Sequence, residues 1–287
     1  MPCYKPLWAW RSPHTGALIW KQSPRSMSWE KLEIPCSQCI GCRLEKSRQW
    51  AMRCMHEASL YEENVFITLT YDDEYLPSDR SLDVTHWQKF MKRLKKSYGG
   101  KKIRFYMCGE YGDETQRPHY HALLFGHDFE DKKFYKFSKS GERLYTTDRL
   151  ERIWGKGYCP IGNVSFESAA YVARYALKKI TGERAGAHYE GRIPEFSTMS
   201  RNKGIGEPWL RKWHTDVYPH DFVIVNGKRV KPPKFYDDML SHRYISDIKD
   251  NRKERAEEHA ENNTDERLAV REEIQQRKQA QIVRTEQ

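Results

Sequence analysis

The chain has 287 residues, of which 38% are hydrophobic and 13% aromatic, so one or two domains with a real core are expected and a wholly disordered protein is excluded. No apolar run approaches the roughly 18 residues of a membrane span, and residues 1–10 lack the order of a signal peptide, so we expect a cytosolic protein without a membrane partner. The formal net charge is +10, and residues 249–287 hold nine basic and ten acidic side chains (net −1), so about +11 lies on residues 1–248. That excess, interleaved with aromatic residues, favours a polyanion such as nucleic acid.

Three segments are predicted from composition. Residues 1–62 form an N-terminal arm and a Cys-rich segment followed by a helix, residues 63–248 form the main domain with an accessory hairpin, and residues 249–287 are a charged tail, either a frayed helix or disordered. Together they predict an α+β fold with helices packed on a central antiparallel sheet of about five strands. In order, the main domain is expected to hold a strand at 65–71, a helix capped by Asp83 or Thr85, an antiparallel hairpin of strands 103–110 and 119–126, a helix at 147–154, a strand at 158–166, a helix at 168–180 and a hairpin at 222–230 around Asn226-Gly227.

A pair of histidines in the second strand of the central hairpin points to a metal site. The period of two in a strand sends His119 and His121 to the same face. Pairing across the eight-residue loop sets Glu110, at the end of the preceding strand, about level with His119. Imidazole binds Mn²⁺ and other divalent ions, and Mg²⁺ prefers oxygen donors, so a carboxylate is the expected third ligand.

The helix at 168–180 separates its side chains into two faces. At about 100° per residue, Tyr171, Tyr175 and Lys178 share one face with Glu167 and Arg174, while the small and apolar residues take the other. Ordinary aromatic packing would have placed the tyrosines among the apolar positions. The pair therefore suggests nucleophiles of a DNA-cutting enzyme.

Three cysteines crowd into Cys36, Cys39 and Cys42, two overlapping CxxC pairs in a chain with an odd number of cysteines. This spacing argues against a secreted disulfide framework and favours a structural Zn²⁺ site. Cys54 and Cys3 are the candidates for a fourth ligand. An iron-sulfur cluster, which the spacing resembles only at its start, and simple reduced thiols are the alternatives.

The motifs resemble, in order, those of the HUH endonuclease superfamily: FITLTY, then GEYG with RPHYHALLFG, then YVARYALK. The two-tyrosine third motif is similar to that of rolling-circle replication initiators of small icosahedral single-stranded DNA phages. Size, the segment CSQCIGCR and the charged tail are most similar to the gokushovirus (Microviridae) initiators. The matching motifs span residues 66–179.

The resemblance implies an HUH/Rep-like fold and a site-specific endonuclease and strand transferase. Mg²⁺ or Mn²⁺ would be held by His119, His121 and Glu110, with Asp113 or Glu114 as substitutes for Glu110. A tyrosine would attack the phage origin, leaving a 5′-phosphotyrosyl link and a free 3′-OH that primes synthesis. Lys178 would stabilise the phenolate or the charge on the phosphate. A second tyrosine would allow the regenerated origin to be cut and the displaced circle to be closed.

The chain lacks a G-x-x-x-x-G-K-[ST] loop, so a host helicase is implied together with a host polymerase, in the cytoplasm of a bacterial host cell. Two other readings stay open from the sequence. A relaxase or two-tyrosine transposase would use the same chemistry at a different DNA site. A non-catalytic zinc-containing nucleic-acid-binding protein would rely on charge and aromatic residues alone.

Overall fold

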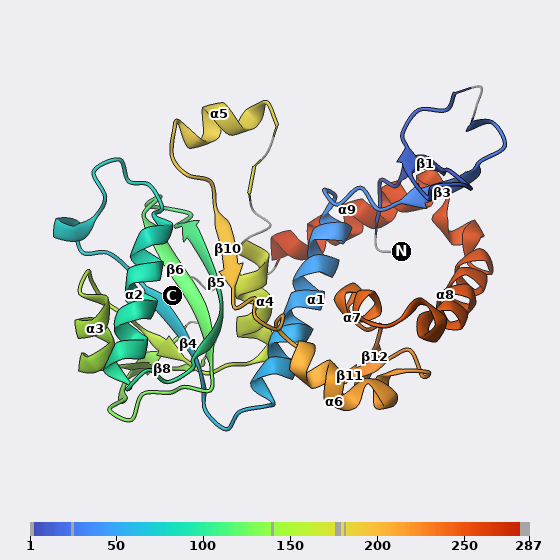
Figure 1. The fold of residues 1–287 in the computed structure, drawn as a ribbon. Helices are drawn as coiled ribbons and strands as arrows, with labels where there is room; N and C mark the ends of the chain where they lie inside the picture. The colour runs from blue at the N-terminus through green and yellow to red at the C-terminus, as the bar shows by residue number, and fades with distance from the viewer. Residues whose placement is uncertain (1–2, 24–25, 139–140, 176–178, 181, 282–287) are drawn as a thin grey trace. The chain divides into compact units, whose positions relative to one another are not determined.

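The computed structural model describes residues 3–23, 26–138, 141–175, 179–180 and 182–281 (Figure 1). The chain divides into two compact units. The first joins the residues up to Lys46 with those from His242 onward, and the second is Ser47–Ser241. The first unit thus combines most of the predicted N-terminal arm with the predicted tail.

The first unit contains a small sheet and the C-terminal helices. An ion pair of 3.0 Å between Lys5 and Glu272 links its two chain segments. Most of residues 249–281 lie in helical elements, in which Leu268 is buried whereas Val270 and Ile274 are exposed. The elements are β1 (Leu7–Arg11), β2 (Leu18–Ile19) and β3 (Glu30–Ile34) in the order β2-β1-β3, the start of α1 (Ile40–Ala58), α8 (His242–Glu257), the 3₁₀ turn η3 (Ala260–Asn263) and α9 (Asp265–Gln281).

The second unit is built on a seven-stranded antiparallel sheet in the order β10-β5-β6-β4-β9-β8-β7, which confirms the α+β class. Two of the strands beyond the expected five or so are β7 and β10, at its two edges. The elements are β4 (Asn64–Leu69), η2 (Asp73–Tyr75), α2 (Val84–Ser97), β5 (Arg104–Tyr111), β6 (Pro118–Phe125), β7 (Lys133–Phe137), β8 (Arg143–Thr146), α3 (Asp148–Trp154), β9 (Ile161–Gly162), α4 (Phe166–Tyr175), α5 (Arg184–Tyr189), β10 (Phe196–Met199), α6 (Glu207–Val217), β11 (Val223–Val225), β12 (Lys228–Val230) and α7 (Lys234–Met239).

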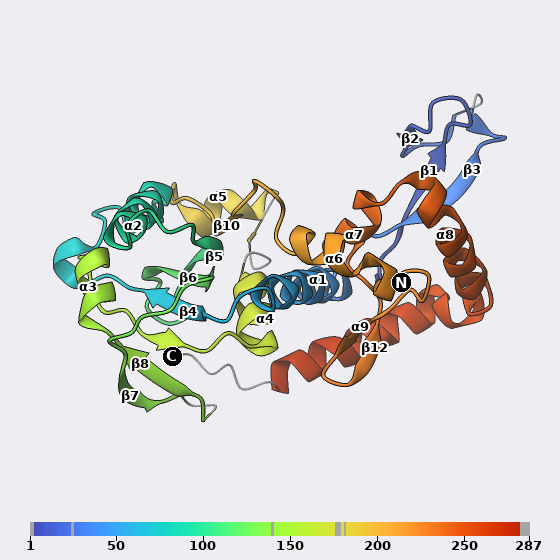
Figure 2. The same cartoon turned by 60° about the horizontal axis from the view of Figure 1, so that its bottom comes forward.

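Helices cover both faces of this sheet (Figures 1 and 2). On one face the apolar stripe of α2, with Trp87 and Phe90, packs with Trp154 of α3 over the strands. On the other face, Ala51 of α1 and Val172 of α4 pack against strand residues that include the alternate positions of β5 and β6. Alternation along β6 therefore sends successive side chains to different layers, because neighbouring residues of a strand point to opposite faces.

Most predicted elements have their expected type. The Asp83 carboxylate accepts a hydrogen bond from the N–H of Thr85 at 2.7 Å, so Asp83 is the cap of α2. The Asn226-Gly227 turn joins β11 to β12. None of the helices within the described ranges has the length and apolar character needed to span a bilayer.

The strand predicted at 158–166 is largely wrong, because only Ile161–Gly162 pair as β9. Pro160 has no N–H to donate, although its carbonyl and that of Tyr158 accept hydrogen bonds from β4 and the residue after it. Ser165 then caps the next helix, since its hydroxyl accepts from the Ser168 N–H at 3.2 Å. As a result α4 begins at Phe166, two residues earlier than predicted.

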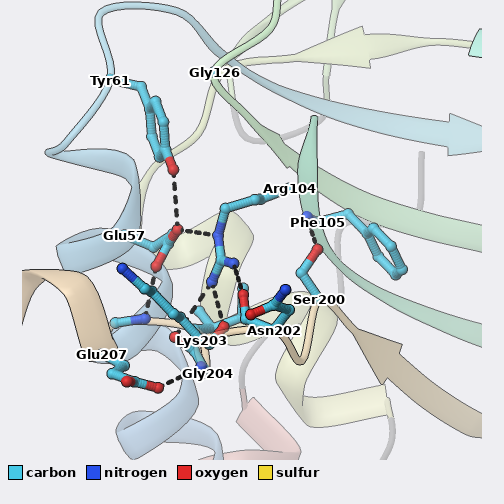
Figure 3. A network of polar contacts seen from close by, with 12 residues as sticks. Glu57, Tyr61, Arg104, Phe105, Gly126, Ser200, Asn202, Lys203, Gly204 and Glu207 are labelled. Carbon is cyan, nitrogen blue, oxygen red and sulfur yellow. Dashed lines mark hydrogen bonds and ion pairs between the residues drawn. The ribbon is translucent and has the colours of Figure 1, made fainter. Parts of the chain in front are cut away.

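A buried ion pair joins α1 to β5 (Figure 3). The Arg104 guanidinium donates to Glu57 Oε1 at 2.5 Å and to the carbonyls of Asn202 and Lys203 at 2.9 and 2.8 Å. The other Glu57 oxygen accepts from the Gly206 N–H at 2.8 Å. Both charged side chains are nearly inaccessible, so the pair ties the chain after β10 to α1 and to β5 of the sheet.

Candidate active site

The central hairpin brings three candidate metal ligands together. In the β5–β6 ladder Glu110 lies directly opposite His119, which confirms the predicted register. Glu110 Oε1 is 2.8 Å from His119 Nε2 and 3.0 Å from His121 Nε2. One ligand atom from each of the three residues lies within 4.8 Å of the others, and Glu110 and His121 are buried. Asp113 and Glu114, the alternative third ligands, line the same cleft from the turn after β5.

The remaining ring nitrogens hold the two imidazoles in place. His119 Nδ1 is 3.1 Å from the Arg117 carbonyl, and His121 Nδ1 is 2.9 Å from the Thr68 hydroxyl. A carbonyl only accepts, so Nδ1 of His119 is the donor in this contact, and whenever the ring is neutral its lone pair lies on Nε2. That lone pair faces an oxygen of the Glu110 carboxylate, an arrangement that requires a proton or a metal cation between them. In metal-binding histidines, the ring nitrogen that does not bind the metal typically makes a hydrogen bond of this kind, which fixes the orientation of the ring.

Two opposing effects act on the Glu110 carboxyl group. Burial raises the pKa of the carboxyl group, but the hydrogen bonds and positive charge of His119 and His121 outweigh it and bring the pKa below its usual value. Its second oxygen, Oε2, is buried and has no hydrogen-bond partner among the described residues. A buried carboxylate oxygen without a donor is costly, and a metal ion would satisfy it.

Helix α4 places Tyr171 beside this trio. Its ring lies edge-on to the His121 ring, with centroids 5.1 Å apart, and edge-on to Phe66 at 6.4 Å. Ala169, Val172 and Ala173, predicted for the opposite face of the helix, are buried. Tyr171 and the trio line one cleft of about 520 Å³.

The other two residues of the tyrosine motif are placed less fully. Tyr175 is the last residue of α4, and the position of its side chain lies outside what the structure describes. Lys178 lies outside the described residues altogether. The helix spacing still sets Tyr175 about one turn beyond Tyr171.

Several cleft residues were not anticipated from the sequence. Thr68 orients His121 from the neighbouring strand β4, and a polar residue inside an otherwise apolar strand was the available signal. Arg117 reaches the Tyr71 carbonyl at 2.6 Å and also lines the cleft. Tyr135 and Lys136 of β7 form part of the wall. Only strand pairing distant in sequence brings these two residues there.

The cysteine cluster lies in the first unit. The Sγ atoms of Cys3, Cys36, Cys39 and Cys42 lie within 4.8 Å of one another, and that of Cys39 is 4.0 Å from that of Cys3. Cys3 is therefore the fourth member, whereas Cys54 lies on α1 and is buried in the apolar layer between this helix and the large sheet.

Backbone N–H groups point at these sulfurs. Burial raises the pKa of the Cys39 thiol, but hydrogen bonds from the N–H groups of Tyr4 and Cys42 outweigh it and lower the pKa to about 7. Four thiols at these separations, with N–H donors to the sulfur, suit a tetrahedral ion with Zn–S bonds of about 2.3 Å, for which neighbouring sulfurs lie roughly 3.8 Å apart.

Fold and site thus define an α+β protein with a Glu-His-His group and a tyrosine-bearing helix on one cleft. A family model described as Replication-associated protein ORF2/G2P matches residues 64–180, which include the trio and both tyrosines. The chain is 33% identical over 246 residues to Replication-associated protein VP4 of Bdellovibrio phage phiMH2K, covering 83% of this chain and 76% of that protein. It is 33% identical over 236 residues to Replication-associated protein ORF2 of Spiroplasma virus 4, covering 76% and 72%.

A third relative is Replication-associated protein ORF4 of Chlamydia phage 1, 30% identical over 217 residues, which are 72% of this chain and 53% of that protein. No solved structure matches the chain. The chain belongs to the family of phage replication-associated proteins, and the resemblance to initiators of the gokushovirus type is confirmed.

Proposed function

We propose that this protein initiates rolling-circle replication of a single-stranded DNA phage genome as a metal-dependent, origin-nicking endonuclease and strand transferase. One observation carries the proposal. A candidate nucleophile, Tyr171, and a candidate metal site, Glu110 with His119 and His121, line the same cleft, with the Tyr171 and His121 rings 5.1 Å apart. The names of the relatives support the replication role.

The donor set fits a divalent cation, Mg²⁺ or Mn²⁺. Nε2 of His119 and of His121 and the Glu110 carboxylate would hold it, while Thr68 and the Arg117 carbonyl keep the two rings in orientation. Bound there, the cation would polarise the scissile phosphate and stabilise the charge that develops on it. With two nitrogen ligands and one carboxylate, Mn²⁺ suits the site at least as well as Mg²⁺.

The proposed chemistry at Tyr171 is an in-line displacement. The phenolic oxygen loses its proton and attacks phosphorus, the new O–P bond forms, and the bond from phosphorus to the 3′-oxygen breaks. The 3′-oxygen takes up a proton and becomes the primer end, and the 5′-phosphate stays on the tyrosine. Tyr175, one turn along α4, is the proposed nucleophile for the regenerated origin, and Lys178 is the proposed stabilising cation.

Other factors are required by this proposal. Because the chain has no phosphate-binding loop of the NTPase type, unwinding and synthesis fall to a helicase and a polymerase of the bacterial host, in whose cytoplasm the protein would act.

We further propose that the four-cysteine cluster binds one structural Zn²⁺. It would hold the chain before β1 to the start of α1, since Cys3 precedes the small sheet and Cys42 lies in the first turn of the helix. Zinc bound by four thiolates leaves no open position, so its role is folding of the first unit rather than catalysis.

Covalent capture tests the nicking function. The purified protein is incubated with labelled single-stranded phage DNA and Mn²⁺ or Mg²⁺, and protein-linked DNA is read on a denaturing gel. His119→Ala with His121→Ala should lower the rate of adduct formation about a hundredfold or more, because several kcal/mol of charge stabilisation are lost. Tyr171→Phe with Tyr175→Phe should abolish the adduct, and Tyr75→Phe, an exposed tyrosine outside the cleft, should not change it.

A wild-type protein that binds DNA but leaves no covalent adduct would refute the enzyme and favour a non-catalytic binding protein. Cutting at a transfer or terminal hairpin site instead of a replication origin would assign the chain to relaxases or transposases.

A further inference from the structure

The edge strand β7 presents aromatic side chains to solvent. It forms one edge of the large sheet, next to β8, and all five of its residues are exposed. Phe134, Tyr135 and Phe137 are 54%, 49% and 58% exposed. An edge strand with uncovered aromatic residues invites association, so a partner is expected to cover it. We call these three residues the aromatic edge.

A register irregularity in β7 distributes the aromatic edge over two faces. Phe134 lies opposite Tyr145 and Phe137 opposite Arg143, with the irregularity between Phe134 and Lys136. Tyr145 and Arg143 are two residues apart on β8 and so share a face, which puts both phenylalanines on that face. Their ring centroids are 5.2 Å apart.

The other face of β7 belongs to the cleft. Lys136 lies opposite Leu144, and both residues line the cleft together with Tyr135. The cleft also holds His121 and Tyr171. Aromatic side chains therefore run from the wall of the candidate active site around the free edge of the sheet to its opposite face.

The charge of the hairpin suits a polyanion. Residues 133–146, which form the β7–β8 hairpin, hold four Lys or Arg and one Glu, a net of +3. Lys132 and Lys133 pair with acidic side chains at 2.5 and 3.0 Å, and the amine of Lys136 lies 5.2 Å from the centre of the Tyr135 ring. Aromatic rings interleaved with cations are the composition of a surface that binds single-stranded nucleic acid, where bases stack and phosphates meet the charges. A protein partner would not require the net positive charge.

We propose that the aromatic edge binds the single-stranded DNA that flanks the scissile phosphate. A base next to the cleft stacks on Tyr135, and the strand then crosses the edge so that further bases stack on Phe134 and Phe137. The position of the scissile phosphate rests on the proposed function, whereas the stacking surface does not. Duplex DNA, whose bases are already stacked, lacks free faces for these rings.

Fluorescence anisotropy with labelled oligothymidylate of about 20 nucleotides tests the surface. The parent protein in this assay is the full chain with Tyr171→Phe and Tyr175→Phe, so that no DNA is cut. Phe134→Leu with Phe137→Leu keeps apolar bulk but removes the rings. Because each stacked base contributes about 1–3 kcal/mol, the affinity for the oligonucleotide should fall at least about tenfold. Trp at both positions should restore parental affinity.

Further arms locate the strand. Trp213→Leu replaces an exposed aromatic residue of α6 and should bind within about twofold of the parent, since non-specific charge contacts are unchanged. With oligonucleotides shortened stepwise, the effect of Tyr135→Leu should persist after that of the two phenylalanine substitutions has vanished. A blunt duplex should bind more weakly than the single strand and should not respond to the leucine substitutions.

The outcomes separate this proposal from the nicking function. If the leucine variants bind single-stranded DNA as tightly as the parent, the proposal that the aromatic edge binds DNA is overturned, even where covalent capture succeeds. Loss of self-association in those variants, with DNA affinity unchanged, overturns it as well and assigns β7 to an interface between copies. Ring-dependent DNA binding together with a wild-type chain that forms no adduct leaves the aromatic edge standing and removes the nicking function alone.

Discussion

Glu57→Gln should destabilise the second unit by roughly 3–4 kcal/mol. The substitution removes the counter-charge of Arg104, whose side chain is 7% exposed. Breaking a buried pair from one side costs about 3–5 kcal/mol, and the carbonyl contacts that Arg104 keeps place the cost at the low end. The amide adds roughly 1 kcal/mol, because its NH₂ group must face either the guanidinium or the Gly206 N–H, both of which are donors.

Thermal unfolding followed by circular dichroism measures this loss. For a unit of this size about 2–4 °C of Tm corresponds to 1 kcal/mol, so Tm should fall by roughly 10 °C. The matched control is Glu63→Gln, which removes a carboxylate from the exposed pair with Lys101 at 3.0 Å. Exposed pairs are worth about 0–1 kcal/mol, so the control should shift Tm by at most about 4 °C.

A double-mutant cycle with Arg104→Met decides whether the pair itself is responsible. The two single substitutions should be non-additive by at least about 1.5 kcal/mol, because each leaves the other charge buried alone. Additive losses, or a Tm for Glu57→Gln within about 2 °C of the control, would contradict a buried ion pair with the contacts drawn in Figure 3.

Three further outcomes are expected. Cys3→Ser should lower bound zinc from about one ion per chain, measured by metal analysis, whereas Cys54→Ser should retain it, and equal zinc in both variants would contradict the four-cysteine site. Burial lowers the pKa of His127 to about 4. Between about pH 6.5 and pH 4 this residue is therefore protonated in the unfolded chain but not in the folded chain. Stability should then fall as the pH drops from about 6.5 to 4, less steeply in His127→Phe, and identical slopes in denaturant titrations would exclude this residue as a cause. Gly157→Ala should destabilise by more than about 2 kcal/mol because its Cβ would lie 2.6 Å from the Asp72 nitrogen, while Gly100→Ala, with open space around it, should cost only its backbone strain of about 1 kcal/mol.

The local pattern of the sequence was sufficient for the core of the candidate site. The spacing of His119 and His121 sets their common face, and the loop length sets Glu110 opposite His119, because hairpin pairing is a short-range constraint. The same holds for α4, where the 3.6-residue period alone predicted that Ala169, Val172 and Ala173 lie on the buried face and Tyr171 on another.

Contacts between segments far apart in the chain could not be predicted from the sequence. It left Cys3 and Cys54 as equal candidates beside the cysteine trio, and only the fold brings Cys3 there across more than thirty residues. Likewise, the ladder that joins β8 to β9 carries Tyr135 to the cleft wall, and the ion pair of Lys5 with Glu272 joins the two ends of the chain in one unit. Periodicity and turn chemistry act over a few residues, whereas strand order and layer packing depend on the free energy of the whole fold, so only the tertiary structure decided these contacts.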